Sequence, residues 1–132
     1  MTVIRPYTDA DYEAVKKNLV EGGLYDETVD KQETLLAKIT AHQGSILVAV
    51  FNSRVVGSVY VIEDPWNSFI FRLAVQKACR KYGIGSSLME EAENRLRNKG
   101  IKDVALFVRA DDKELIQYYA KRGYTPMDKQ HQ

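Results

Sequence analysis

The chain has 132 residues, of which 45% are hydrophobic and 28% charged, as expected for one soluble globular domain and not for a disordered chain or a fibre. The formal charge of +1 disfavours a nucleic-acid binder, and a single cysteine with only two histidines excludes an intrachain disulfide and disfavours a metal site. The longest apolar run, Ile46–Phe51, is too short to span a membrane, so we expect a cytoplasmic protein.

The first third of the chain is predicted to form one strand and two helices. A short strand is expected at Val3–Arg5, and apolar residues at helical spacing then predict a helix that ends near Glu21. Thr28 is a plausible N-cap for a second helix, which should end before Gly44.

Three β-rich segments follow at Ser45–Phe51, Arg54–Glu63 and Phe69–Val75. The third is apolar on both faces apart from Arg72, so we expect it in the middle of the sheet. A charged side chain in such a strand needs an oppositely charged partner or access to solvent. Arg72 would pair with Glu63 on the neighbouring strand or meet an acidic part of a substrate.

The last part of the chain is predicted to add two helices and two strands. The first of these helices has one buried stripe, formed by Ile84, Leu88, Ala92 and Leu96. A buried strand is expected at Asp103–Val108, and a capping box at Asp111 and Glu114 predicts a helix that stops at Gly123. A final strand would begin within Tyr124–Met127. The predicted order is βααβββαβαβ, a mixed α/β fold in a single domain spanning residues 1–132.

A glycine-containing loop, Arg80-x-x-Gly83-x-Gly85, lies between the predicted central strand and the helix with the buried stripe. A helix N-terminus offers unpaired N–H groups and a partial positive charge, and glycines let the backbone approach a bulky phosphate. Arg80 and Lys81 add positive charge, so the loop suits a pyrophosphate. A tight turn with solvated basic residues is the alternative.

This loop, preceded by Leu73-Ala74-Val75 and followed by Ser86-Ser87-Leu88, resembles the acetyl-CoA-binding segment of the GNAT (general N-acetyltransferase) superfamily. The segment Tyr119-Ala120-Lys121-Arg122-Gly123-Tyr124 resembles the end of the last helix of that family. The element order also matches, and the resemblance spans about residues 2 to 127.

The resemblance implies a GNAT-like splayed mixed sheet flanked by helices, in which the pantetheine arm of acetyl-CoA lies between two diverging strands. It implies that backbone around Leu73 and Val75 pairs with this arm, while N–H groups from Lys81 to Ser86 hold the pyrophosphate. The implied cofactor-binding residues are Leu73, Ala74, Val75, Arg80, Lys81, Tyr82, Gly83, Ile84, Gly85, Ser86 and Tyr119.

For catalysis, Tyr119 matches the family tyrosine that often protonates the leaving thiolate, and its alternative role is a core aromatic. No motif identifies the base, for which Glu63 at a strand end is the candidate, with simple solvation of the strand end as the alternative. Tyr25 and Glu27, in the loop between the first two helices, and Arg72 are candidate substrate-binding residues.

Charge is unevenly distributed along the chain. Residues 9–33 contain eight acidic and three basic side chains, whereas residues 77–102 contain seven basic and three acidic ones. This division agrees with an anionic cofactor on one side and a cationic amine on the other, or with two solvated helix faces.

Only eight residues follow Tyr124, enough for one of the two strands with which the family usually ends. The missing strand leaves a sheet edge that would favour a homodimer. The resemblance implies an acetyl-CoA-dependent N-acetyltransferase that acts by direct transfer on a primary amine, of a small molecule in preference to a protein. The alternative is a CoA-binding regulatory or interaction module without transferase activity.

Overall fold

The computed structural model describes residues 1–108 and 110–126. Within them the chain forms a mixed sheet of five strands. The strands are β1 (Thr2–Pro6), β2 (Ile46–Phe51), β3 (Arg54–Ile62), β4 (Ser68–Val75) and β5 (Val104–Ala105). The helices are α1 (Tyr12–Glu21), α2 (Glu27–Asp30), α3 (Gln32–Ala41), α4 (Ile84–Asn98) and α5 (Lys113–Lys121), with short 3-10 helices at η1 (Asp9–Asp11) and η2 (Lys77–Tyr82).

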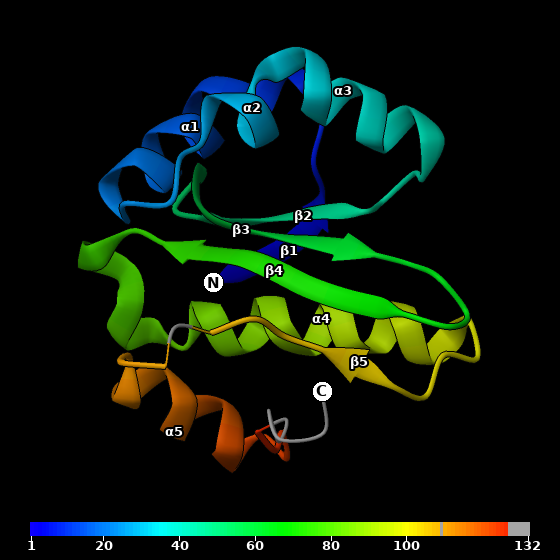
Figure 1. Ribbon diagram of the computed structural model, residues 1–132. Coiled ribbons are helices and arrows are strands. Elements are labelled where there is room, and N and C mark those ends of the chain that lie inside the picture. The colour runs from blue at the N-terminus through cyan, green and yellow to red at the C-terminus, as the bar shows by residue number, and fades with distance from the viewer. Residues whose placement is uncertain (109, 127–132) are drawn as a thin grey trace.

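The helices cover both faces of the sheet. Helices α1, α2 and α3 lie over one face, and α4 and α5 lie on the other (Figure 1). Each face has its own hydrophobic cluster, one around Leu19, Leu35 and Tyr60 and the other around Leu88 and Leu96. The predicted stripe of α4 is confirmed, because Ile84, Leu88, Ala92 and Leu96 are all fully buried. In the part of the chain that the structure describes, no helix is long and apolar enough to cross a membrane.

The sheet is splayed between β4 and β5, and the middle strand is β3 and not β4 as predicted. Strands β1 to β4 pair antiparallel in chain order, and β5 pairs parallel to β4. The parallel pairing covers only Ser68 with Val104 and Phe69 with Ala105. Beyond Phe69 the two strands separate, which opens the sheet between them (Figure 1). This arrangement confirms the predicted mixed α/β class and its splayed sheet.

A β-bulge interrupts β4 at Arg72. Tyr60 of β3 pairs with Phe71 and Ser58 pairs with Ala74, so two residues of β4, Arg72 and Leu73, face one residue of β3. Arg72 has a φ of +57°, in the left-handed region that side chains other than glycine rarely adopt. Because a bulge shifts the alternation by one residue, Phe71 and Ala74 both pack toward α1–α3, whereas Leu73 packs toward α4.

Three predicted elements differ from the structure. The second helix is divided into α2 and α3, since Lys31 between them has extended backbone, and the N-cap of α2 is Asp26 and not Thr28. The strand predicted at Asp103–Val108 is reduced to the two residues of β5. Helix α5 is capped by Asp112, whose side chain accepts from the N–H of Leu115, in place of Asp111.

The predicted final strand, Tyr124–Met127, is only partly testable. Residues 124–126 do not form a strand, and Met127 lies outside the described residues. The described part of the chain therefore follows the predicted element order up to the last helix.

Candidate active site

The loop between β4 and α4 presents a row of backbone N–H groups. Gly83 has a φ of +73° and begins α4, and the first bond within the helix runs from the Ser87 N–H to the Gly83 carbonyl, at 3.1 Å. The N–H groups of Ile84, Gly85 and Ser86 precede that bond and point out of the helix end. A Cβ added at Gly83 would have nothing within 4 Å, so no other described part of the chain packs against this position. The geometry suits the pyrophosphate of CoA.

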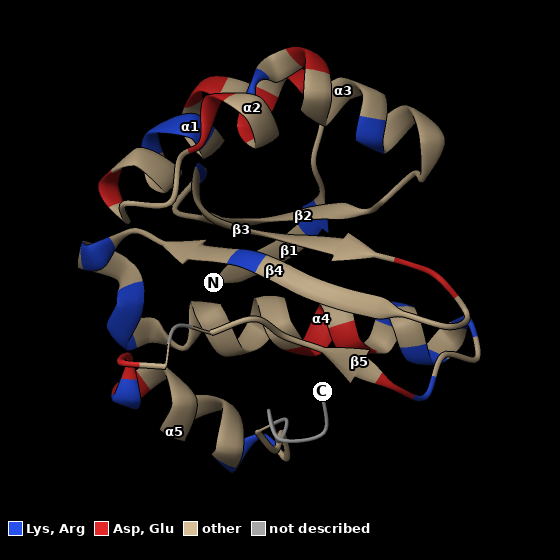
Figure 2. Ribbon diagram, in the orientation of Figure 1, with Lys and Arg blue, Asp and Glu red and all other residues tan. Residues whose placement is uncertain are grey.

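Basic side chains surround this loop. Arg80 is held against the end of β4 by a hydrogen bond from its Nε to the Val75 carbonyl, at 3.0 Å. The Tyr82 ring stacks on Phe51 with the centroids 5.0 Å apart, and the Nζ of Lys81 lies over the Tyr82 ring. Lys and Arg are grouped where the chain passes from β4 to α4, whereas acidic and basic residues are mixed on α1 and acidic residues predominate on α2 (Figure 2). The potential at the loop therefore favours an anion.

A pocket of about 470 Å³ passes through the sheet where β4 and β5 separate. Leu24 and Phe71 line it and pack with the cluster under α1–α3, whereas Leu73, Leu115 and Tyr119 line it and pack with the cluster around α4. Its remaining lining residues are Ile62, Phe69, Ile70, Arg72, Leu106 and Phe107. The pocket thus lies between the two hydrophobic clusters, and no residue of the loop or of α4 at 76–98 lines it.

Tyr119 lies on the α4 side of this pocket. It is 8% exposed, and its ring makes edge contacts with those of Tyr118 and Tyr124. Burial, assisted by the neighbouring Tyr118, raises the pKa of the Tyr119 phenol to about 12. The hydroxyl therefore keeps its proton at neutral pH and can donate a hydrogen bond.

The neighbouring Tyr118 also contributes to the loop, which the sequence analysis did not foresee. Its hydroxyl is 3.0 Å from the Oγ of Ser86, on the first turn of α4. This contact joins α5 to the N-terminal end of α4. No local signal in the sequence distinguishes it, since the two residues are 32 positions apart.

Arg72 pairs with Asp30 of α2, so the predicted pairing with Glu63 is wrong. The distance from Arg72 Nε to the Asp30 carboxylate is 3.4 Å. The Asp30 side chain is fully buried, and it also accepts from the Tyr60 hydroxyl and the Asp26 N–H, both at 2.9 Å. A buried carboxylate is stable when several donors surround it. Sequence reasoning missed Asp30 and Tyr60, because the contact of Asp30 with Arg72 spans 42 residues.

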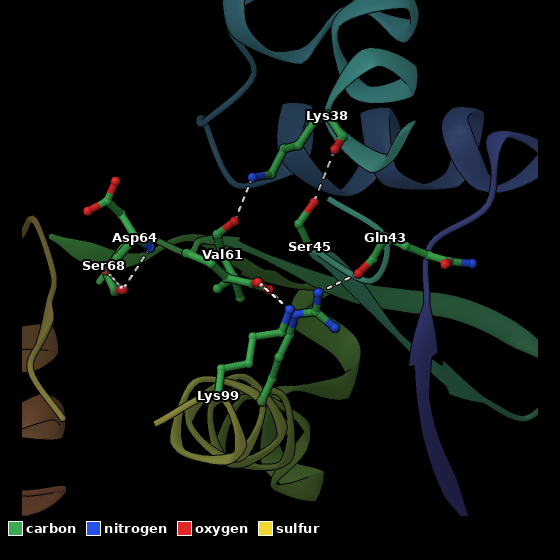
Figure 3. A network of polar contacts seen from close by, with 9 residues as sticks. Lys38, Gln43, Ser45, Val61, Asp64, Ser68 and Lys99 are labelled. Carbon is green, nitrogen blue, oxygen red and sulfur yellow. Dashed lines mark hydrogen bonds and ion pairs between the residues drawn. The ribbon is translucent and has the colours of Figure 1, made fainter. Parts of the chain in front are cut away.

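Glu63 faces the opposite side of the sheet, at the C-terminal end of α4. Its carboxylate forms ion pairs with Arg95 and with the Nζ of Lys99, the latter at 2.9 Å, and its side chain is 7% exposed. Figure 3 shows this region, with Lys99 on the α4 side of the sheet and Lys38 on the other side, where its Nζ donates to the Val61 carbonyl at 2.6 Å. Burial lowers the pKa of Lys38 to about 8.

The role of Glu63 as general base stays a prediction, and its surroundings argue against it. Burial raises the pKa of its carboxyl, but the bonds from Lys99 and Arg95 lower it by more, so the pKa lies below its usual range. A carboxylate with two cationic partners and a low pKa is a weak base. Helix α4 has 15 residues, so its C-terminal end lies roughly 20 Å from the anion-binding loop.

These ion pairs predict a pH-dependent contribution to stability. Because the folded-state pKa of Glu63 lies below its unfolded value, the contribution is present at neutral pH and is lost as the pH falls through the folded pKa. Glu63→Gln should lower the midpoint of urea unfolding at pH 7. The difference in midpoint between this variant and the wild type should become smaller as the solution is acidified. Glu90→Gln, at an exposed position of α4, is the control. A Glu63→Gln difference that stays constant down to about pH 3 would contradict this linkage.

The other predicted substrate residues lie away from the pocket. The Tyr25 hydroxyl donates to Glu27 at 2.7 Å and is 3.1 Å from the Tyr12 hydroxyl, but neither Tyr25 nor Glu27 lines the pocket, whereas the preceding Leu24 does. Their roles stay predictions.

Much of the acidic segment stabilises the local structure. Asp11 accepts hydrogen bonds from both terminal nitrogens of Arg5 and closes the capping box of η1. Asp26 caps α2. Glu21 accepts from the Lys77 N–H. These partners explain much of the predicted charge asymmetry without a substrate.

Comparison with known proteins agrees with this site. A family model described as "Acetyltransferase (GNAT) family" matches residues 11–124. An uncharacterized N-acetyltransferase of Methanocaldococcus jannaschii is 29% identical over 123 residues, covering 92% of this chain and 77% of the relative. An acetyltransferase of Pectobacterium atrosepticum is 29% identical over 125 residues, covering 95% of this chain and 89% of the relative.

Solved structures share the fold. The crystal structure of Ard1 from Thermoplasma volcanium superposes with a TM-score of 0.85 at 25% identity, covering 96% of this chain and 84% of that one. The PaiA N-acetyltransferase of Thermoplasma acidophilum, solved with coenzyme A, has the same TM-score at 23% identity, covering 97% of this chain and 92% of that one. The chain therefore belongs to the acetyltransferase (GNAT) family and is an N-acetyltransferase that takes its acetyl group from acetyl-CoA.

Proposed function

We propose that the protein acetylates the primary amine of a small molecule by direct transfer within a ternary complex. The observation that carries this proposal is the pocket where the sheet splays, which is lined on one side by residues packed under α1–α3 and on the other by Leu73, Leu115 and Tyr119. Two substrates entering from opposite faces would meet inside it. Its volume lies in the range of small-molecule sites.

The lining supports transfer without a covalent enzyme intermediate. Among the described residues that line the pocket there is no cysteine, serine or lysine to act as a nucleophile. Cys79 is 4% exposed and belongs to the hydrophobic cluster around α4, as expected for a small buried side chain. The acceptor amine itself is then the nucleophile.

The residues of the loop and the pocket have separate roles in this proposal. The N–H groups of Ile84, Gly85 and Ser86, with Arg80 and Lys81, hold the pyrophosphate, and β4 backbone at Leu73 and Val75 aligns the pantetheine arm. Acetyl-CoA supplies an activated acyl carbon: the C–N bond forms as the C–S bond breaks. The amine gives up one proton and the thiol product gains one.

In this proposal Tyr119, which lines the pocket, assists the leaving sulfur. Its pKa of about 12 lies above that of a thiol, near 8.5, so it acts as a hydrogen-bond donor that stabilises the thiolate and not as a group that ionises fully. This is a narrower role than complete protonation, which the family resemblance implies.

The first experiment is a thermal-shift titration with acetyl-CoA and CoA, followed by initial rates of thiol release with a panel of amines. A ligand present at 100 times its Kd should add about 2.7 kcal/mol to the free energy of unfolding, which raises the Tm by several degrees. Intersecting double-reciprocal plots would support the ternary complex, and parallel plots would contradict it. Binding of CoA with no turnover of any amine would favour the CoA-binding module instead.

A further inference from the structure

We infer that Arg72 binds a carboxylate of the acceptor, so that the acceptor is a small amine that also carries a carboxylate group. This inference rests on the proposed function and narrows it to one substrate class. It depends on where the β4 bulge places Arg72, on what holds the side chain there and on what else lines the pocket.

The bulge gives Arg72 its position. In an uninterrupted strand the residue after Phe71 would point toward α4, into the hydrophobic cluster around Leu88. The extra residue and the φ of +57° at Arg72 place its side chain on the α1–α3 face, where it meets Asp30. A backbone conformation that is costly for a side chain is often retained at binding sites.

The partners of Arg72 hold its guanidinium at Nε and leave the two terminal nitrogens available. Asp30 is fully buried and is held by Tyr60 and the Asp26 N–H, so it is a rigid anchor. It engages Arg72 only through Nε, at 3.4 Å. Among the described residues, neither terminal nitrogen of Arg72 has a hydrogen-bond partner, and the side chain is 22% exposed. Two parallel donors remain, which is the geometry that binds a carboxylate through both oxygens.

The rest of the pocket makes such a partner necessary. Of the described lining residues Arg72 is the one charged side chain, and all the others except Tyr119 are apolar. A ligand that fills this pocket removes water from the guanidinium, and donors left without acceptors weaken binding. A carboxylate on the ligand satisfies them, whereas the acidic side chains of Glu27 and Asp26 lie outside the lining.

The same charge assists the reaction. The amine must lose its proton before it attacks, and a nearby cation lowers the pKa of an ammonium group. Arg72 would therefore bind the carboxylate and also favour the neutral amine. For an acceptor with an amine and no anionic group, Arg72 only lowers the pKa of the ammonium group and adds no binding contact.

The test compares acceptors that differ only in the carboxylate. Leucine and phenylalanine are each assayed against their α-carboxamides, with acetyl-CoA and the full-length protein, and kcat/KM is measured by thiol release. The acid is expected to exceed its amide by about tenfold or more for at least one pair. In Arg72→Gln this ratio should fall toward one, and Arg72→Lys should retain part of it. Arg54→Gln, at an exposed position of β3, is the matched control and should keep the ratio.

The outcomes separate this inference from the proposed function. A Tm increase with CoA in Arg72→Gln and Arg72→Lys shows that both variants are folded. Equal kcat/KM for acids and amides, an unchanged ratio in Arg72→Gln, or faster turnover of a peptide with blocked carboxyl groups overturns the inference and leaves acetyl transfer intact. Absence of a CoA-induced shift in the wild-type protein overturns the proposed function itself.

Discussion

Replacing Tyr119 by phenylalanine is expected to lower kcat roughly 100-fold while the affinity for CoA stays close to that of the wild type. The substitution removes one hydroxyl from a buried ring on the α4 side of the pocket, and the ring keeps its contacts with Tyr118 and Tyr124. Only the donor to the leaving sulfur is lost, so the loss should appear in kcat and not in ligand binding. Rates of thiol release and calorimetric titration with CoA measure the two quantities separately.

The control for this prediction is Tyr124→Phe. The Tyr124 hydroxyl donates to Glu93 at 2.7 Å, and the residue does not line the pocket through the sheet. This variant loses a tyrosine hydroxyl and its hydrogen bond outside the pocket, so it reports the effect of lost stability alone. Equal rates for Tyr119→Phe and the wild type would remove Tyr119 from the mechanism, and weaker CoA binding in the same variant would assign it to the cofactor site.

Replacing Gly83 by valine is expected to weaken CoA binding by at least about tenfold. The new side chain would strain a backbone with a φ of +73° at the N-cap of α4. This strain would displace the first N–H groups of the helix, which hold the pyrophosphate in the proposed function. Calorimetric titration with CoA gives the Kd, and thermal unfolding without ligand gives the cost to stability.

Gly100 offers a control at the other end of the same helix. Its φ is +79°, and a Cβ added there would also have nothing within 4 Å. Gly100→Val should therefore lower the Tm by a similar amount and leave the Kd for CoA unchanged. If Gly83→Val bound CoA as tightly as Gly100→Val, the loop would be a structural turn and the phosphates would bind elsewhere.

Features determined by local chemistry could be predicted from the sequence. The loop with Gly83 and Gly85 and the buried stripe of α4 depend on residues a few positions apart, and both are found where they were expected. Motifs of this length also carry the family resemblance, which the comparisons confirm. Helix boundaries were less predictable, because the break at Lys31 follows no glycine or proline.

Features that depend on distant residues could not be predicted. Arg72 could be identified as a charge in need of a partner, but both Asp30 and Glu63 were compatible with that need, and only the fold brings Asp30 to it. The bulge at Arg72 is defined by the register of β4 against β3, which no periodicity along β4 alone reveals. The length of β5 is likewise set by its pairing with β4, which covers two residues.

The bulge has a consequence for how acceptor choice can diverge among proteins of this fold. The residues of β4 on either side of it, Phe71 and Leu73, each pack against one of the two hydrophobic clusters, so a change at either position disturbs the interior. The side chain at position 72 packs in neither cluster and lines the pocket. Substitution at this one position can therefore alter which amine is accepted without disturbing either hydrophobic cluster, at the cost of one donor to the buried Asp30 carboxylate. New specificities would be reached by single mutations there.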